Sequence, residues 1–251
     1  MGKYLVFHIY GPMSSWGDTA VGEYRPTFSH PSKSAIVGLV AGALGIKRTD
    51  EGRLRVLSEQ LGFGVLVLSP GTLLRDYHTT QVPSQATIKK GPVFTRKDEL
   101  SYKDQNTILS TRDYRSDAAY RIVLWARDDS ADLDSIWKAL RMPVFAPYLG
   151  RKSCPPAIPF QPELIDASSA AEAISKTRHS LGDLLRGIGK GVGVSTGTKG
   201  RYLLYLEREE GIDVEKLATH WRKDRLINRR NWQYGDRQEI LVEVGEDDVF
   251  K

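Results

Sequence analysis

Cysteine is nearly absent from this sequence, and so is any long apolar run. Cys154 is the single cysteine among 251 residues, so no disulfide can form within the chain. A chain without disulfides is typical of a reducing compartment, and we expect a cytoplasmic protein. The first apolar stretch, residues 4–10, contains His8 and ends at Gly11-Pro12, which makes it too short for a membrane span or for the apolar part of a signal peptide. We therefore expect no membrane partner.

The sequence also lacks the spacings of common metal-binding and nucleotide-binding motifs. None of its histidines has zinc-ligand spacing to another; they lie at positions 8, 30, 78, 179 and 220. The glycine-rich run that begins at Gly187 has neither the P-loop nor the dinucleotide-binding spacing. We therefore expect no metal ion and no cofactor. Metal-independent cleavage of RNA by Tyr77, His78 and a lysine stays open as an alternative, through general acid–base chemistry.

An excess of one charge is small over the whole chain. The net charge is +5, from 36 Lys and Arg against 31 Asp and Glu. Its distribution is uneven, because residues 221–230 hold five basic residues and one aspartate, whereas residues 243–248 are acidic. Separated blocks of charge are typical of a surface for a polyanion, and equally of an ordinary solvated face. Charge alone does not decide between the two.

The apolar pattern predicts an α+β fold. Strands are expected at residues 3–10, 63–68, 118–126, 144–149, 201–207 and 239–244. Helices are expected at residues 32–45, 50–61, 132–141 and 170–178. Extended arms at residues 73–80 and 107–115 enclose a polar segment and predict a long protruding hairpin, and the seven glycines of residues 180–200 predict a mobile loop. The order β, α, β, hairpin, β, α, β resembles a ferredoxin-like or RRM-type fold, whose open sheet face commonly binds RNA.

The first expected helix has an unusual face. Ser32 is its N-cap, and Ser34, Gly38 and Gly42 follow at i, i+4 and i+8, which leaves one face nearly free of side chains. Each glycine costs about 1 kcal/mol relative to alanine in a helix interior, so something must compensate. Tight packing on the sheet is one explanation, and the spacing alone favours it; close approach of a nucleic-acid backbone is the other. Lys33 in the first turn, next to free N–H groups, indicates a phosphate site.

Arginines and aromatic residues alternate along both arms of the hairpin. Arg75 and Tyr77 are expected on one face of their strand and His78 on the other, and Arg112 and Tyr114 repeat the Arg-x-Tyr spacing on the second arm. Such faces suit phosphate contact and base stacking, and they also suit an exposed hairpin with ordinary cross-strand pairs. Both interpretations stay open.

A short turn after the expected strand at residues 144–149 is a further candidate. It offers a ring for stacking at Tyr148, an accessible backbone at Gly150, and cations at Arg151 and Lys152. The alternative is a turn that simply ends a strand.

Several of these segments together resemble the CRISPR-associated family-five proteins, in the form found in type I-E systems. The matching segments are residues 11–17 (GPMSSWG), 25–27 (RPT), 31–34 (PSKS), 44–46 (LGI), 74–79 (LRDYHT), 114–118 (YRSDA) and 148–155 (YLGRKSCP). They occur in the family's order across about residues 1–160.

The resemblance implies a fold and an assembly. The fold would be a modified ferredoxin-like or RRM (RAMP) domain at residues 1–150, with a β-hairpin thumb at about 79–112 and a smaller β-rich extension at 151–251 packed on the same domain. The chain would be a crRNA-binding subunit of the Cascade antiviral complex that holds the crRNA 5′ handle and caps the backbone. Its partners would be the backbone subunit, the large subunit CasA and, indirectly, target DNA.

The resemblance also places the site. The handle surface would include Arg25 and Thr27 before the first helix, Lys33, Ser34, Gly38 and Gly42 on it, and the turn at 148–152. Some relatives in type I-C systems cleave repeat RNA with Tyr, Lys and His, where Lys and His are adjacent. This sequence has no Lys-His pair, because His78 follows Tyr77. The departure favours a non-catalytic subunit, with an endoribonuclease as the alternative. Separately from the resemblance, the basic charge of residues 221–230 suggests a contact with target DNA or a neighbouring subunit.

Overall fold

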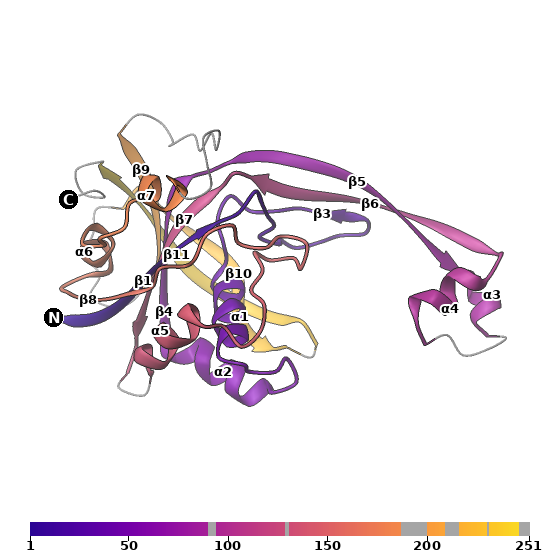
Figure 1. Ribbon diagram of the computed structural model, residues 1–251, viewed down its shortest axis with the longest axis horizontal. Helices are drawn as coiled ribbons and strands as arrows, with labels where there is room; N and C mark the ends of the chain where they lie inside the picture. The colour runs from indigo at the N-terminus through magenta and orange to yellow at the C-terminus, as the bar shows by residue number, and fades with distance from the viewer. Residues whose placement is uncertain (90–93, 129–130, 187–199, 209–215, 230, 246–251) are drawn as a thin grey trace.

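The computed structural model describes residues 1–89, 94–128, 131–186, 200–208, 216–229 and 231–245, and it is built around one large antiparallel sheet (Figure 1). Seven strands form this sheet in the order β10-β11-β9-β4-β7-β1-β8. Their bounds are β1 Gly2–Tyr10, β4 Leu61–Ser69, β7 Ala119–Ala126, β8 Glu163–Ala167, β9 Arg201–Glu207, β10 Ala218–Asn228 and β11 Gln233–Gly245. Strands from both sides of position 150 share the sheet, and the division into a domain at 1–150 and an extension at 151–251 stays a prediction.

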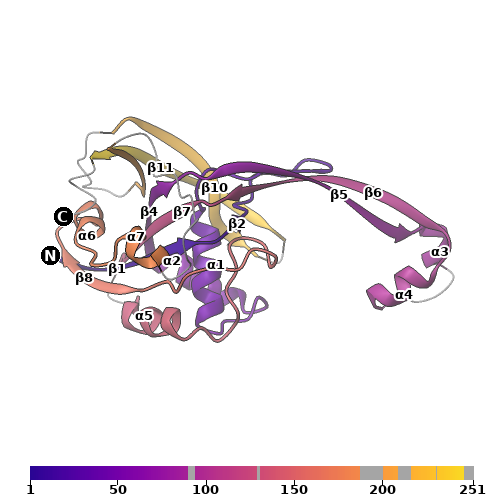
Figure 2. The same ribbon diagram turned by 45° about the horizontal axis from the view of Figure 1, so that its top comes forward.

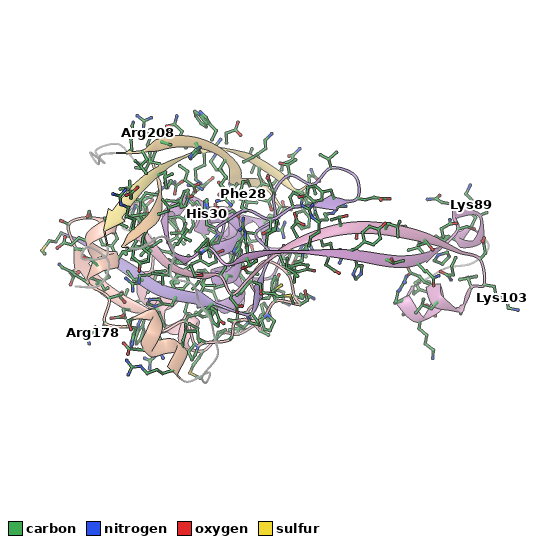
Figure 3. All side chains as sticks on the ribbon, turned by 90° about the horizontal axis from the view of Figure 1, so that it is seen from above. Phe28, His30, Lys89, Lys103, Arg178 and Arg208 are labelled. Carbon is green, nitrogen blue, oxygen red and sulfur yellow. The ribbon has the colours of Figure 1, made fainter. Side chains whose placement is uncertain are left out.

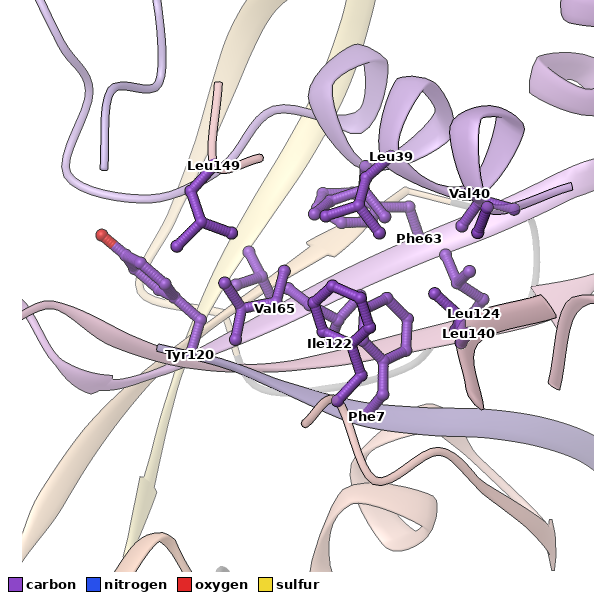
Figure 4. Close-up of a cluster of buried hydrophobic side chains, with 14 of the residues drawn as sticks. Phe7, Leu39, Val40, Phe63, Val65, Tyr120, Ile122, Leu124, Leu140 and Leu149 are labelled. Atoms are coloured by element: carbon purple, nitrogen blue, oxygen red, sulfur yellow. The ribbon is translucent and has the colours of Figure 1, made fainter. Parts of the chain in front are cut away.

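Helices cover both faces of the sheet. On one face α1 (Lys33–Ala43) and α5 (Leu133–Arg141) bury Leu39, Val40 and Leu140 against the strands, as Figure 4 shows, and α2 (Glu51–Gln60) packs beside α1. On the other face a second core includes α6 (Ala170–Ser175), and α7 (Leu181–Leu185) adds Leu185 to it. Within the described part of the chain, no helix has the length and apolar character needed to cross a bilayer.

A long hairpin projects from this body. Strands β5 (Thr72–Pro83) and β6 (Gln105–Ser116) pair antiparallel over their whole length and carry α3 (Gln85–Ile88) and α4 (Arg96–Ser101) at the far end (Figures 1 and 2). At its base, β6 also pairs with β2 (Met13–Ser14) and β3 (Tyr24–Arg25). The extended arms are confirmed. The short helices at the tip were not predicted, although α4 starts with a capping box at Thr95.

Most elements of the body follow the sequence pattern. The expected strands at 3–10, 63–68, 118–126 and 201–207 are confirmed, as are the helices at 32–45, 50–61 and 132–141. Ser32, Asp50 and Asp132 each accept a bond from the backbone N–H three residues on, which is the N-cap geometry. Gly45 ends α1 with a φ of 72°. Of the glycine-rich segment, positions 187–199 lie outside the described residues.

The expected strand at 144–149 is wrong. The segment is irregular, and the sheet position beside β1 is taken by β8 instead. Val144 N and Phe145 N donate to Ala43 O and Gly42 O, at 3.0 and 3.2 Å, so this backbone is bonded to the end of α1. Prolines at 143 and 147 also lack the N–H that a sheet ladder needs.

Strand β10 was not predicted from the sequence, because charged residues occupy both its buried and its exposed positions and no apolar alternation is visible. Trp221 and Lys223 are exposed, whereas Arg222 and Asp224 between them are 5% and 3% exposed. A period of two is the signature of a strand with one buried face, but the buried positions here are charged. The described part of this segment, residues 221–229, is therefore not a continuous basic surface.

Candidate nucleic-acid interface

Helix α1 leaves its glycine face open. A Cβ built at Gly38 or Gly42 would meet no described heavy atom within 4 Å. The opposite face carries the buried residues Ile36 and Val40. Packing on the sheet, which the spacing favoured, is therefore the wrong explanation for these glycines. The helix instead presents bare backbone, with Ser34 at its start bonded to Ser32 Oγ at 3.1 Å.

The N-terminus of α1 is occupied by carboxylates of the same chain. Lys33 is 2% exposed, and its Nζ donates to both carboxylate oxygens of Glu207 at 3.1 and 2.9 Å. The backbone N–H of Lys33 donates to Asp224 Oδ2 at 2.9 Å. Burial lowers the pKa of Lys33, although the charge of Glu207 acts in the opposite direction. The predicted phosphate contact of Lys33 is therefore wrong in this structure, because its ammonium and its N–H already have anionic partners.

These carboxylates belong to a larger buried charge network. Arg237 donates to Asp224 at 2.7 and 2.8 Å and to Glu239 at 2.7 Å, and Glu239 pairs with His30 Nε2 at 3.1 Å. Burial opposes ionisation of Glu239, but the bond to His30 and the charge of Arg237 outweigh it and lower its pKa to about 2. The network joins β10 and β11 to the residues just before α1. The network therefore holds the N-terminus of α1, from which the open glycine face extends, against these two strands.

A second charge cluster organises the base of the hairpin. Arg75 Nε and Nη2 donate to the two oxygens of Asp113 at 2.9 and 3.1 Å, and Tyr24 Oη donates to Asp113 at 2.6 Å. The bond from Arg75 is the main cause that lowers the pKa of Asp113. The Arg75 side chain is 56% exposed, so its guanidinium is held in place but still open to a ligand. Neither Tyr24 nor Asp113 was singled out in the sequence, although an Arg-Asp-Tyr triplet occurs on both arms, at 75–77 and 112–114.

The register of the hairpin separates the two Arg-x-Tyr pairs. Arg75 lies opposite Asp113 and Tyr77 opposite Thr111, whereas Arg112 lies opposite Asp76 and Tyr114 opposite Leu74. Directly opposed residues of an antiparallel ladder share a face, so the Arg75 pair and the Arg112 pair lie on different faces. Tyr77 is 67% exposed and can stack on a base.

On the other face of the hairpin, the stacking prediction fails for Tyr114. This residue is only 8% exposed and belongs to the core, so it has no ring face for a base. Arg112 Nε donates to Ser110 Oγ at 3.2 Å. His78 lies on this face as well, with Nδ1 3.6 Å from Asp76 Oδ2.

The turn at 148–152 docks on the loop before α1. Ser15 N donates to Leu149 O at 3.0 Å, and a Cβ at Gly150, whose φ is 84°, would lie 1.8 Å from Ser15 O. Only glycine fits such an approach. The Arg151 guanidinium lies over the buried Tyr114 ring at 4.6 Å, which leaves Tyr148 and Lys152 as the exposed members.

Arg25 and Thr27 take different positions. Arg25 is exposed on β3, beside Arg112 of β6, and donates to the carbonyl oxygens of Gly22 and Tyr24. Thr27 Oγ1 accepts a bond from Trp16 N at 2.8 Å and so shapes the loop. The structure thus brings Arg25 and Arg112 together on one face of the hairpin base, leaves Arg75 on the other face, and removes Lys33 from the surface. Among the described residues, no group of three or more His, Cys, Asp or Glu side chains could hold a metal ion.

Comparison with known proteins identifies the family. The family model described as CRISPR-associated protein (Cas_Cas5) matches residues 4–232. The chain is 33% identical over 193 residues to the CRISPR system Cascade subunit CasD of Escherichia coli (strain K12), covering 73% of this chain and 81% of that protein.

Two solved structures share the mixed α+β fold. One belongs to a CRISPR RNA-guided surveillance complex, with a TM-score of 0.60 and 24% identity, covering 96% of this chain and 90% of that one. The other is a crystal structure of a Cas protein, with a TM-score of 0.59 and 23% identity, covering 99% and 98%. The family match over residues 4–232, together with the identity to CasD, shows that this chain belongs to the Cas5 family of CRISPR-associated proteins.

Proposed function

We propose that the chain is the crRNA-binding subunit of a type I-E Cascade surveillance complex, where it holds the crRNA 5′ handle and caps the backbone. The relationship to CasD supports this assignment. The observation that carries it is the open face of α1, because two interior glycines whose added Cβ would meet no described atom are accounted for by the close approach of an RNA backbone.

Polar and aromatic groups continue this open face towards the hairpin. The segment bonded to the end of α1 through Val144 and Phe145 leads to the turn at 148–152, which packs on the hairpin base. The exposed groups along this path offer cations for phosphates and rings for bases. They are Arg25, Tyr148, Lys152 and the half-buried Arg112, together with Arg75 and Tyr77 on the hairpin face opposite to Arg112. Thr27, Gly150 and Arg151 position the path, and Lys33 anchors the helix.

The sheet order supports the ferredoxin-like assignment. Strands β8, β1, β7 and β4 lie side by side in that order, all antiparallel, with α1 following β1 and α5 following β7. This is the strand arrangement of a βαββαβ unit. In our proposal residues 79–112 of the hairpin are the thumb, which reaches the neighbouring backbone subunit. Lys89 and Lys103 at its far end are free to meet that subunit or the RNA (Figure 3).

Other parts of the proposal follow from the assembly. The chain would work in the cytoplasm, contact the large subunit CasA beside the handle, and meet target DNA only through the guide. Residues 151–251 would form the extension packed on the domain at 1–150.

We also propose that the subunit does not cleave RNA. Tyr77 and His78 are consecutive residues of a regular strand, so their side chains point to opposite faces of the hairpin and do not converge on one phosphate. Incubation of the purified protein with repeat RNA in EDTA tests this directly. Specific cleavage that disappears in His78→Ala would establish the endoribonuclease alternative.

Binding to a labelled handle RNA at several salt concentrations tests the main proposal. The affinity should fall steeply with salt, and Arg25→Glu should weaken it and make the salt dependence shallower by about 0.7 per lost phosphate contact on a single strand. Arg178→Glu is the control, because Arg178 is 90% exposed and lies at the end of the body away from the hairpin (Figure 3). Salt-independent binding, or equal losses in the two variants, would contradict the proposed surface.

A further inference from the structure

The turn between β10 and β11 carries an exposed tryptophan in an unusual backbone conformation. Trp232 is 58% exposed and has a φ of 54°. Bulky residues rarely adopt positive φ, and a large apolar ring gains nothing for the fold when it stays in water. Core packing therefore does not explain why tryptophan occupies this position.

Two arginines lie over the Trp232 ring from different parts of the chain. The Arg229 guanidinium is 3.8 Å from the ring centroid and donates to Tyr234 Oη at 2.9 Å. The Arg48 guanidinium, from the loop between α1 and α2, is 4.9 Å from the same centroid. We call Arg48, Arg229 and Trp232 the Trp232 cluster.

A small apolar cluster brings the two loops together. Leu226, near the end of β10, packs against Ile46 in the α1–α2 loop and Leu54 in α2. The apolar contacts therefore hold the two loops of the Trp232 cluster together, while the Trp232 ring stays exposed to solvent. Its parts come from positions far apart in the sequence and meet only in the folded chain.

Four cations at this turn have no carboxylate partner in the described part of the chain. Lys47, Arg48, Arg225 and Arg229 form no ion pair with a carboxylate among the residues that the structure describes. The buried arginines of the same strands behave differently, since Arg237 pairs with two carboxylates. Uncompensated arginines beside an exposed indole are typical of sites where guanidinium groups hold phosphates and the ring stacks on a base.

We propose that the Trp232 cluster binds a single-stranded segment of nucleic acid. Arg48 and Arg229 hold its phosphates, and a base stacks on Trp232, taking the place of the more distant Arg48 guanidinium. None of these residues belongs to the glycine face of α1 or to the hairpin, so the contact is additional to the handle surface. RNA and DNA single strands offer the same phosphates and bases, and the experiment separates them.

Fluorescein-labelled 12-nucleotide strands of uridine and of deoxythymidine, which lack any handle sequence, test the proposal by fluorescence polarisation with the full chain. Arg48→Ala/Arg229→Ala should lower the affinity at least fivefold and make the logarithmic salt dependence shallower by about 1.4, from 0.7 for each of two phosphates. Trp232→Ala should lower it severalfold, and Trp232→Phe should restore part of the loss because a smaller ring still stacks. The strand type with the larger loss identifies RNA or DNA as the ligand.

Trp221→Ala is the matched control. Trp221 lies on β10, is 68% exposed, and has no arginine over its ring among the described contacts. It should bind both strands as the wild type does. Unchanged affinity in the cluster variants, an equal loss in Trp221→Ala, or a defect confined to assembly with other subunits would overturn the proposal. Thermal unfolding of each variant separates lost binding from lost folding, and Trp232→Phe keeps the test informative if Trp232→Ala is unstable.

Discussion

Alanine at the two interior glycines of α1 should stabilise the protein while it weakens RNA binding. An alanine in a helix interior is favoured over glycine by about 1 kcal/mol. At Gly38 and Gly42 this gain has no steric cost within the described part of the chain, because the new Cβ meets none of its heavy atoms within 4 Å. Gly38→Ala should therefore raise the free energy of unfolding by about 1 kcal/mol, and the double variant by about 2 kcal/mol if the sites act independently. For a chain of 251 residues, each kcal/mol corresponds to roughly 2–4 °C in Tm.

The same methyl groups stand where we place the RNA backbone. Gly38→Ala should lower handle affinity, and Gly38→Leu should lower it further because its side chain extends beyond the methyl. Urea denaturation gives the stability and fluorescence polarisation with labelled handle RNA gives the affinity. A variant that is both more stable and a weaker binder separates function from folding.

Gly45 provides the internal control at the end of the same helix. Its φ is 72°, and a Cβ there would meet Val144 at 3.0–3.3 Å, so Gly45→Ala should destabilise the protein by about 1 kcal/mol or more. Loss of stability in Gly38→Ala would show that the glycine face is covered in solution. Unchanged handle affinity in Gly38→Leu would show that the RNA lies elsewhere.

Three further predictions concern the elements that hold the site. Glu207→Gln leaves the buried Lys33 ammonium without its carboxylate and should cost about 3–5 kcal/mol of unfolding free energy, measured by urea denaturation. Burial lowers the pKa of His8 to about 3, so between pH 6.5 and 3 the unfolded chain binds a proton that the folded chain does not. As the pH falls through this range, the free energy of unfolding should fall by up to about 1.4 kcal/mol per pH unit. His8→Gln should reduce this pH dependence, and an unchanged dependence would assign it to other groups. Gly150→Ala should lower Tm by several degrees, because its Cβ would overlap Ser15 O, and a normal Tm would show that this contact is loose.

Local rules account for the parts of the fold that the sequence predicted. An N-cap such as Ser32 or Asp132 and a regular apolar period act within a few residues, so α1, α5 and the strands β1, β4 and β7 could be recognised before the structure was known. The arms of the hairpin followed in the same way. Short motifs such as residues 148–155 also pointed to the right family, because close backbone contacts such as that of Gly150 with Ser15 permit few residue types.

Tertiary structure decided what the polar residues do. Lys33 donates to Glu207, which lies 174 positions further along the chain. The sequence therefore could not show whether the ammonium group pairs with a carboxylate of the protein or with a phosphate of a ligand. Asp224 is buried within a segment that is basic overall, and Tyr114 is buried although Tyr77 in the equivalent triplet is exposed. The glycine face of α1 is open because no described element packs over it, and spacing in the helix carries no information about that. Apolar period and capping residues thus determined the elements, and short motifs indicated the family, whereas long-range packing decided which charges and faces stay available to RNA.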